Sequence, residues 1–66
     1  MWRMTVTQNE IIIAERSYYS AHECTVSMDK ARQHYEAKGE AVTIEMKDKN
    51  KALIATLKVN PLTLLQ

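Results

Sequence analysis

The sequence predicts a small α+β fold, an antiparallel sheet of four to five strands with one helix packed on it. Three observations predict it. Apolar residues alternate with polar ones near the N-terminus and in two runs near the C-terminus. A charged loop, residues 47–51, joins the two C-terminal runs into a hairpin. A segment with helix start and stop signals lies directly before that hairpin. The predicted element order is β-β-(β)-α-β-β.

The first predicted strand carries Trp2, Met4 and Val6 in alternation with polar residues. Side chains alternate across a strand, so these three should face a core. Residues 8–10 predict a turn, because an asparagine at its centre readily adopts a left-handed conformation. Residues 11–14 contain three consecutive isoleucines and predict a second strand, which we expect to be central in the sheet or covered on both faces.

The predicted helix follows a segment of mixed signals. Residues 17–26 predict one irregular strand or two short ones, since tyrosine, threonine and valine favour strands. Ser27 predicts the helix N-cap, and Asp29 would then lie in the first turn, where negative charge complements the helix dipole. Lys38 would lie in the last turn. Gly39, the only glycine, stands where a left-handed residue ends many helices.

The predicted helix has one narrow apolar stripe. Met28, Ala31 and Tyr35 share a face through their three- and four-residue spacing. A stripe of this width is typical of a helix that lies across one face of a sheet.

The C-terminal hairpin is predicted from two alternating runs that face the same core. Their inward residues are Val42, Ile44, Met46, Leu53, Ala55, Leu57 and Val59. Pro61 should end the last strand, because proline lacks a backbone donor. Residues 61–66 are then an apolar tail on a single α+β domain that spans residues 1–66.

Composition and charge narrow the classes of function. Hydrophobic residues make up 45% of the chain and charged residues 26%, which is ordinary for a globular domain. The net charge of +1 disfavours a protein built mainly to neutralise nucleic-acid phosphates. No apolar run approaches the roughly 20 residues that span a bilayer, so we expect no membrane partner. Cys24 is the only cysteine and no secretory signal is visible, which together predict a cytoplasmic location.

Few residues could carry catalysis or hold a metal. His22, Cys24 and His34 are the soft ligands, whereas a structural zinc site usually needs four ligands in recognisable spacing. A Cys24 nucleophile would need a lowered thiol pKa and an orienting third group, so a small buried hydrophobe is the favoured role of this residue. The single glycine excludes a glycine-rich phosphate loop. We therefore predict no catalytic, cofactor-binding or metal-binding residues.

The remaining signals favour binding of another protein. Tyrosine and tryptophan are enriched at contact hot spots, and apolar residues at chain ends either close a core or form a patch for a partner. The free edges of the sheet also offer pairing with a strand of a partner. The predicted partner-binding residues are Trp2, Tyr18, Tyr19, Lys47, Lys49, Lys51, Leu62, Leu64 and Leu65.

The main function hypothesis is a small non-catalytic protein that binds another protein. Its size and architecture favour an inhibitor or accessory regulator of the type that phages and mobile elements carry, for example an anti-defence or anti-CRISPR-like protein. A homodimer is a further expectation, because so short a chain without disulfides has few other sources of stability. The alternative is a nucleic-acid-binding module that uses the basic loop 47–51. A thiol enzyme that uses Cys24 is the third hypothesis.

Overall fold

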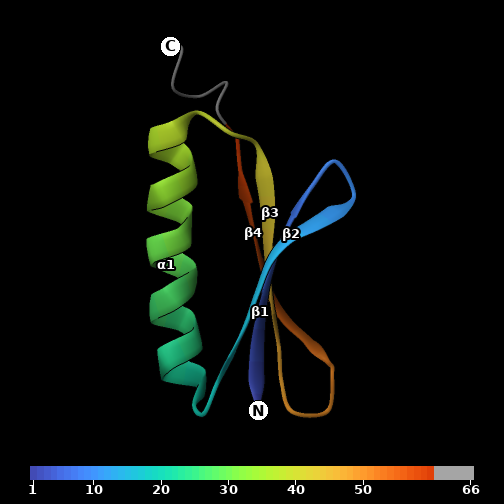
Figure 1. The fold of residues 1–66 in the computed structure, drawn as a ribbon. Coiled ribbons are helices and arrows are strands. Elements are labelled where there is room, and N and C mark those ends of the chain that lie inside the picture. The colour runs from blue at the N-terminus through green and yellow to red at the C-terminus, as the bar shows by residue number, and fades with distance from the viewer. Residues whose placement is uncertain (61–66) are drawn as a thin grey trace.

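The computed structural model describes residues 1–60, in which one helix packs on a four-stranded antiparallel sheet (Figure 1). This confirms the predicted fold class, with four strands in the described residues. The predicted tail, residues 61–66, and with it Leu62, Leu64 and Leu65, lies outside the described residues. The elements are β1 (Trp2–Gln8), β2 (Ile11–Tyr18), α1 (Ala21–Lys38), β3 (Val42–Lys47) and β4 (Leu53–Val59).

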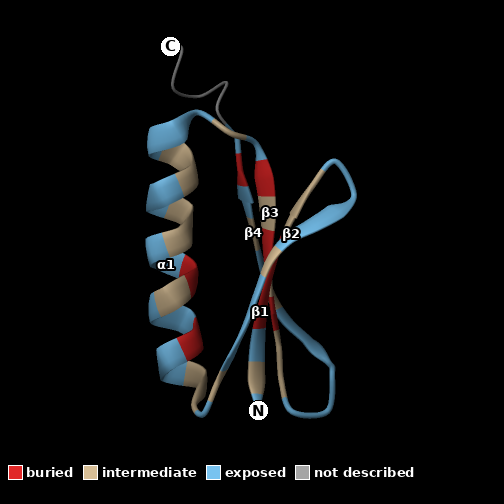
Figure 2. Ribbon diagram, in the orientation of Figure 1, coloured by how far each residue is buried: buried red, intermediate tan, exposed pale blue. Residues whose placement is uncertain are grey.

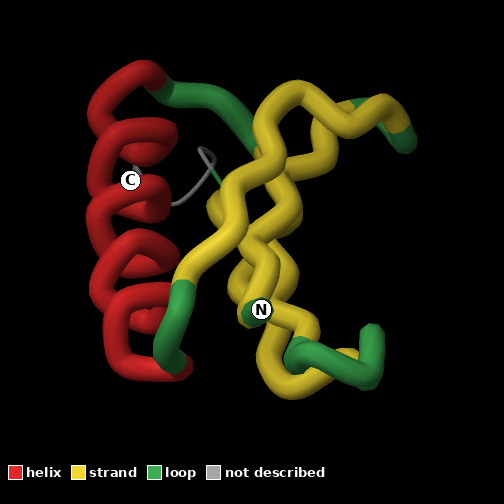
Figure 3. The backbone as a smooth tube through the Cα atoms, turned by 60° about the horizontal axis from the view of Figure 1, so that its bottom comes forward, coloured by secondary structure: helices red, strands yellow, loops and turns green. Residues whose placement is uncertain are grey.

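The sheet order is β2-β1-β3-β4, so the two strands that carry most of the core, β1 and β3, lie in its centre. Helix α1 runs along one face of the sheet, and the opposite face stays open among residues 1–60 (Figures 1 and 3). Buried residues cluster where α1 meets the central strands (Figure 2). The buried apolar residues are Met4, Val6, Cys24, Met28, Val42, Ile44, Met46 and Val59.

The first hairpin has a two-residue turn. Asn9 and Glu10 both have positive φ, at 53° and 66°, which matches the twist that tight hairpins require. This confirms the predicted turn. The strand alternation of β1 is confirmed as well, because Met4 and Val6 are buried and Trp2 packs against the core.

The prediction that residues 11–14 form a central or doubly covered strand is wrong. Strand β2 is an edge strand that pairs with β1 alone among the described residues. Ile11, Ile12 and Ile13 are 66, 59 and 42% exposed. β-Branched residues favour the extended backbone whether or not they are covered, so their run predicts a strand without predicting its place in the sheet.

The helix begins seven residues earlier than predicted. Ser20 is the N-cap, and its hydroxyl accepts a hydrogen bond of 3.1 Å from the backbone N–H of Glu23. The N-cap assigned to Ser27 is therefore wrong, and so is the strand predicted within residues 17–26 beyond the end of β2. The Ser-x-x-Glu spacing of Ser20 and Glu23 is a helix-start signal. It outweighs the strand preference of residues 24–26, because Cys24 then packs beside Met28 on the buried face.

The predicted end of the helix is confirmed. Gly39 adopts φ 73° and ψ 28°, the left-handed conformation. Its N–H donates to the carbonyl of Glu36 at 3.0 Å, and the N–H of Glu40 donates to that of Tyr35 at 3.1 Å. These two bonds form the Schellman motif, which satisfies carbonyls that the helix end leaves without partners. Lys38 lies in the last turn as expected.

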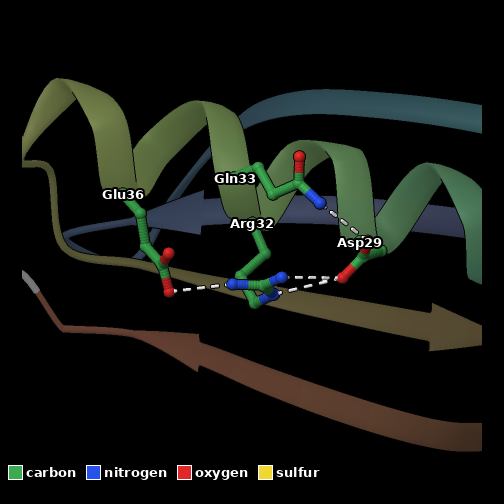
Figure 4. Close-up of polar contacts among 4 residues, drawn as sticks. All are labelled: Asp29, Arg32, Gln33 and Glu36. Carbon is green, nitrogen blue, oxygen red and sulfur yellow. Dashed lines mark hydrogen bonds and ion pairs between the residues drawn. The ribbon is translucent and has the colours of Figure 1, made fainter.

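The exposed side of α1 carries a polar network (Figure 4). Arg32 donates to Asp29 at 2.8 Å and to Glu36 at 3.0 Å, and Gln33 donates to the second oxygen of Asp29 at 2.9 Å. Asp29 was predicted in the first turn and instead lies in the middle of the helix, where these bonds hold it. The stripe of Met28, Ala31 and Tyr35 packs against the core, which confirms that prediction.

The second hairpin matches the predicted alternation over most of its length. In β3, Val42, Ile44 and Met46 are buried, and in β4 Val59, Leu57 and Ala55 lie opposite them in that order. Leu53 departs from the prediction.

Leu53 is 54% exposed and lies opposite Lys47, because the register shifts after Met46. One extra residue at this bulge moves Leu53 from the covered face to the open face.

Candidate interaction surface

The sheet face opposite α1 is hollowed and mainly polar. Both hairpin tips curve away from the helix, so that the open face lies between them (Figure 1). The space enclosed, called the hollow below, measures about 520 Å³. Its lining residues come from both hairpins: Met1, Arg3, Thr5, Thr7, Ile12, Glu15, Ser17, Glu45, Lys47, Asp48, Lys49 and Lys51. Strand alternation explains the polarity, because the residues between those that face α1 must point to this side.

The charges of the hollow are mixed rather than of one sign. Its cations are Arg3, Lys47, Lys49 and Lys51, and its carboxylates are Glu15, Glu45 and Asp48. Arg3 lies between Ser17 of β2 and Lys47 of β3 in the sheet, and its guanidinium is 4.0 Å from the carboxylate of Glu15. A surface of this kind suits a partner with both charges and hydrogen-bonding groups.

The loop between β3 and β4 is shaped by one carboxylate. Asp48 accepts hydrogen bonds from the backbone N–H groups of Asn50 at 2.8 Å and Ala52 at 3.0 Å. Lys51 has a φ of 68°. The loop therefore has a defined turn, which presents the exposed side chains of Lys49 and Lys51 beside the hollow.

An apolar tip adjoins the hollow. We call Ile11, Ile12 and Ile13 the isoleucine tip. In the register of the first hairpin, Ile12 lies opposite Thr7 and Ile11 opposite Gln8, while Ile13 is the extra residue of a bulge. Ile12 therefore lines the hollow, and its neighbours extend an apolar surface around the free edge of β2.

The isoleucine tip is not among the residues that the sequence predicts to bind a partner. The sequence signal for its exposure is its position directly after a two-residue turn, at the end of a hairpin. Three large aliphatic side chains in a row on an open edge are an unusual use of exposed surface, and such patches commonly mark interaction sites.

The predicted binding residues fall into separate groups. Trp2 and Tyr18 lie opposite each other in the sheet and pack against the core on the side of α1. Tyr19, the next residue, is 85% exposed. The three lysines, Lys47, Lys49 and Lys51, are brought together beside the hollow. The structure thus joins the lysines to one another and separates them from Trp2 and Tyr18, which occupy the other face.

The cysteine lies in the core. Cys24 has no exposed surface, and burial raises the pKa of its thiol. Its predicted role as a small hydrophobe is confirmed by this position. In residues 1–60 there is no cluster of three or more histidine, cysteine, aspartate or glutamate side chains placed to hold a metal ion. The one described helix lacks the length and apolar character needed to cross a membrane.

Comparison with known proteins yields no match to any family model, curated protein or solved structure.

Proposed function

We propose that this protein is a small non-catalytic binding protein that acts by contact with another protein, as an inhibitor or accessory regulator of the type that phages and mobile elements carry. The observation that carries the proposal is the isoleucine tip on the free edge of β2. It combines an exposed apolar surface with a strand edge that no other strand of the described residues covers.

The apolar contribution to binding is large for so small a surface. Moving one isoleucine side chain from full exposure to full burial is worth roughly 1.5–3 kcal/mol. Ile11, Ile12 and Ile13 retain 66, 59 and 42% of their exposure. A partner that covers all three would gain several kcal/mol, which offsets part of the cost of association, about 4–15 kcal/mol. Backbone pairing along the edge of β2 would have to supply the rest.

The free edge of β2 would orient a bound partner segment and select its sequence. An extended segment of a partner can pair with the backbone of β2, as in other complexes that add a strand to a sheet. Glu15 and Arg16, adjacent on β2 and both exposed, would select the charge of the residues placed opposite them. The bound protein would then be blocked sterically at the segment that pairs.

A binding role without catalysis is supported by the chemistry of the described residues. Cys24, the one thiol, is buried among apolar side chains with a raised pKa, which lowers its thiolate content and its access to a substrate. The hollow is lined mainly by polar and charged residues, whereas pockets for small substrates are lined predominantly by apolar and aromatic ones.

The test is a pair of lysine substitutions. Immobilised wild-type protein is expected to retain a partner protein from a host-cell lysate, and the affinity of the purified partner is then measured. Ile12→Lys places a charge in the isoleucine tip and should weaken this binding at least tenfold. Val26→Lys, at an exposed apolar residue of α1, is the matched control and should leave it unchanged. Equal retention by Ile12→Lys and wild type would overturn the proposal.

The alternative function, nucleic-acid binding through the loop 47–51, is favoured by one observation. Arg3 joins Lys47, Lys49 and Lys51 around the same hollow. Against it stand the three carboxylates of the hollow and the placement of Trp2 and Tyr18 on the opposite face, where they could not stack on bases held by these lysines.

Salt dependence separates the two functions. Binding of a single-stranded oligonucleotide should weaken with salt with a log–log slope of about −0.7 for each phosphate contact, and Lys49→Gln should reduce that slope. A complex held by the isoleucine tip should change little between low and high salt. No oligonucleotide binding at low salt would remove the alternative.

A further inference from the structure

The two edges of the sheet carry different charge patterns. Strand β2 contains Glu15 and Arg16 side by side near its middle. Strand β4, with the sequence LIATLKV, carries the single charge of Lys58 and is an edge that no strand of residues 1–60 covers. Free edges are usually protected from other strands by charges, prolines or short length. Seven residues of β4 have little of this protection.

A symmetric pairing of two copies has one geometric requirement. When two identical strands pair antiparallel about a two-fold axis, the residue at the axis lies opposite its own copy. In β2 the regular part beyond the bulge, residues 14–18, is centred on Arg16. Pairing there would set two guanidinium groups opposite each other, and a shift by one residue toward the bulge would do the same for two Glu15 carboxylates. A shift the other way would centre the pair on Ser17 and leave only residues 16–18 of β2 paired symmetrically. Like charges directly opposite destabilise a pair.

In β4, symmetric antiparallel pairing of two copies brings no like charges opposite each other. Its regular part beyond the bulge, residues 55–59, is centred on Leu57. At this centre Leu57 lies opposite its own copy and Ala55 opposite Val59, all on the side of α1. On the open side Thr56 lies opposite Lys58. No like charges meet, and every pair on the covered side is apolar.

Packing on the covered side gives a second reason for pairing. Ala55 and Leu57 pack against the core but remain partly exposed, because α1 packs mainly on the central strands β1 and β3. A second copy beside β4 would cover them. A chain of 66 residues buries a smaller fraction of its surface than a larger domain does, so covering further apolar groups stabilises it appreciably.

We propose that β4 is a self-association edge, where a second copy of this chain pairs antiparallel to form a symmetric dimer with one continuous sheet. The two-fold axis is perpendicular to the sheet, so both helices cover one side. Both hollows and both isoleucine tips then open on the other side, and the dimer presents two binding surfaces. This inference does not rest on the proposed protein-binding function, because it concerns the opposite edge.

The decisive variant is Thr56→Lys. Within one copy the introduced lysine would lie opposite Glu45 of β3, an attractive pair that preserves the fold. Across the dimer it would lie opposite Lys58 of the second copy, and the symmetry repeats this repulsion. In the neighbouring register, centred on residue 56, the two introduced lysines would oppose each other. The variant therefore tests both registers.

The measurement is sedimentation equilibrium over a range of concentrations. Wild type should be a dimer, and Thr56→Lys should dissociate at least tenfold more readily while its circular dichroism and melting temperature stay native-like. Ile12→Lys, the matched charge on the other edge, should keep the dimer. A monomeric wild type, a dimeric Thr56→Lys, or a dimer broken by Ile12→Lys would each overturn the proposal.

A covalent trap gives an independent readout. Residues opposite each other in an antiparallel pair have Cα atoms about 4.5–5.5 Å apart, within the range of a disulfide. Leu57→Cys should form a disulfide-linked dimer on mild oxidation, detected on a non-reducing gel. Ala14→Cys, on the covered side of β2, should not. Linkage of Ala14→Cys in preference to Leu57→Cys would place self-association at β2 and contradict the proposal.

The two proposals fail separately. Loss of partner binding in Ile12→Lys with the dimer intact supports both, whereas a monomeric wild type that still binds its partner through the isoleucine tip leaves only the first.

Discussion

The covered and open faces of the sheet are built from the same four strands, yet one is apolar and the other is mainly polar. They also differ in the exceptions to this alternation. The covered face holds the buried apolar residues of the strands. The open face is lined mainly by threonine, serine and charged residues, and its exceptions include Ile12 and Leu53. Both lie just beyond a bulge.

The two bulges act alike. In β2 the extra residue, Ile13, places Ile12 opposite Thr7, and in β4 the shift places Leu53 opposite Lys47. Without them, strict alternation would turn both side chains toward α1. One inserted residue reverses the face of everything beyond it, so each bulge transfers an apolar residue from core to surface. The apolar part of the interaction surface thus arises from the irregular positions of the sheet.

The largest difference between the faces should appear on truncation of an isoleucine. Ile44 has no exposed surface, so Ile44→Ala should cost about 3 kcal/mol of unfolding free energy from lost burial and the cavity left behind. Ile12→Ala, on the open face, should cost less than about 0.5 kcal/mol. Urea unfolding measures both.

Ile44→Val is the milder variant should Ile44→Ala fail to fold, and it should cost about 1 kcal/mol. Equal losses for Ile12→Ala and Ile44→Val would mean that the open face contributes to the core as much as the covered one.

The covered face depends on a helix that ends where it does. Gly39 has a φ of 73°, and a Cβ there would meet no atom within 4 Å. Any loss of stability in Gly39→Ala must therefore come from the backbone conformation, and we expect it to be about 1–2 kcal/mol of unfolding free energy. Gly39→Asn should cost less, because asparagine tolerates this region. Thermal unfolding compares the three proteins, and equal melting temperatures would contradict the left-handed assignment.

The start of the helix gives a slightly smaller expected effect. Ser20→Ala removes the hydroxyl that accepts the N–H of Glu23 and should cost about 1 kcal/mol. Ser27→Ala, inside the helix, should be close to neutral or slightly stabilising, because alanine is the better helix former. The reverse ranking in denaturant unfolding would restore a helix that begins at Ser27.

The smallest effect concerns pH. Burial raises the pKa of Cys24 above its ordinary value of 9.0, so well below pH 9 the thiol is protonated in both the folded and unfolded states. Above pH 9 the unfolded chain releases the proton more readily, and the stability of the folded state falls as the pH rises. The difference in unfolding free energy between pH 8 and pH 10 should therefore be larger for wild type than for Cys24→Ala. An equal difference would mean that the thiol titrates normally in the fold.

The predicted binding residues show which features of the candidate site can be predicted from local sequence patterns. The charged loop between two alternating runs indicates a hairpin turn, so the grouping of Lys47, Lys49 and Lys51 follows from sequence. The exposure of the isoleucine tip does not follow from sequence. A run of β-branched residues predicts an extended backbone, but its exposure depends on which strand becomes an edge.

Local sequence patterns correctly predict the fold class, the inward faces of β1 and β3, the first turn and the helix end at Gly39. Each depends on interactions between residues close in the chain, such as side-chain alternation and left-handed backbone positions. Tertiary structure decided the sheet order, the edge position of β2 and the faces of Ile12 and Leu53. These depend on which distant segments pair and where a bulge interrupts the register. The residues of one strand do not by themselves specify which strands pair with it. The start of the helix depends on both local sequence and tertiary packing. The signal at Ser20 is local, but it prevails over the strand preference of the following residues only once Cys24 is packed in the core.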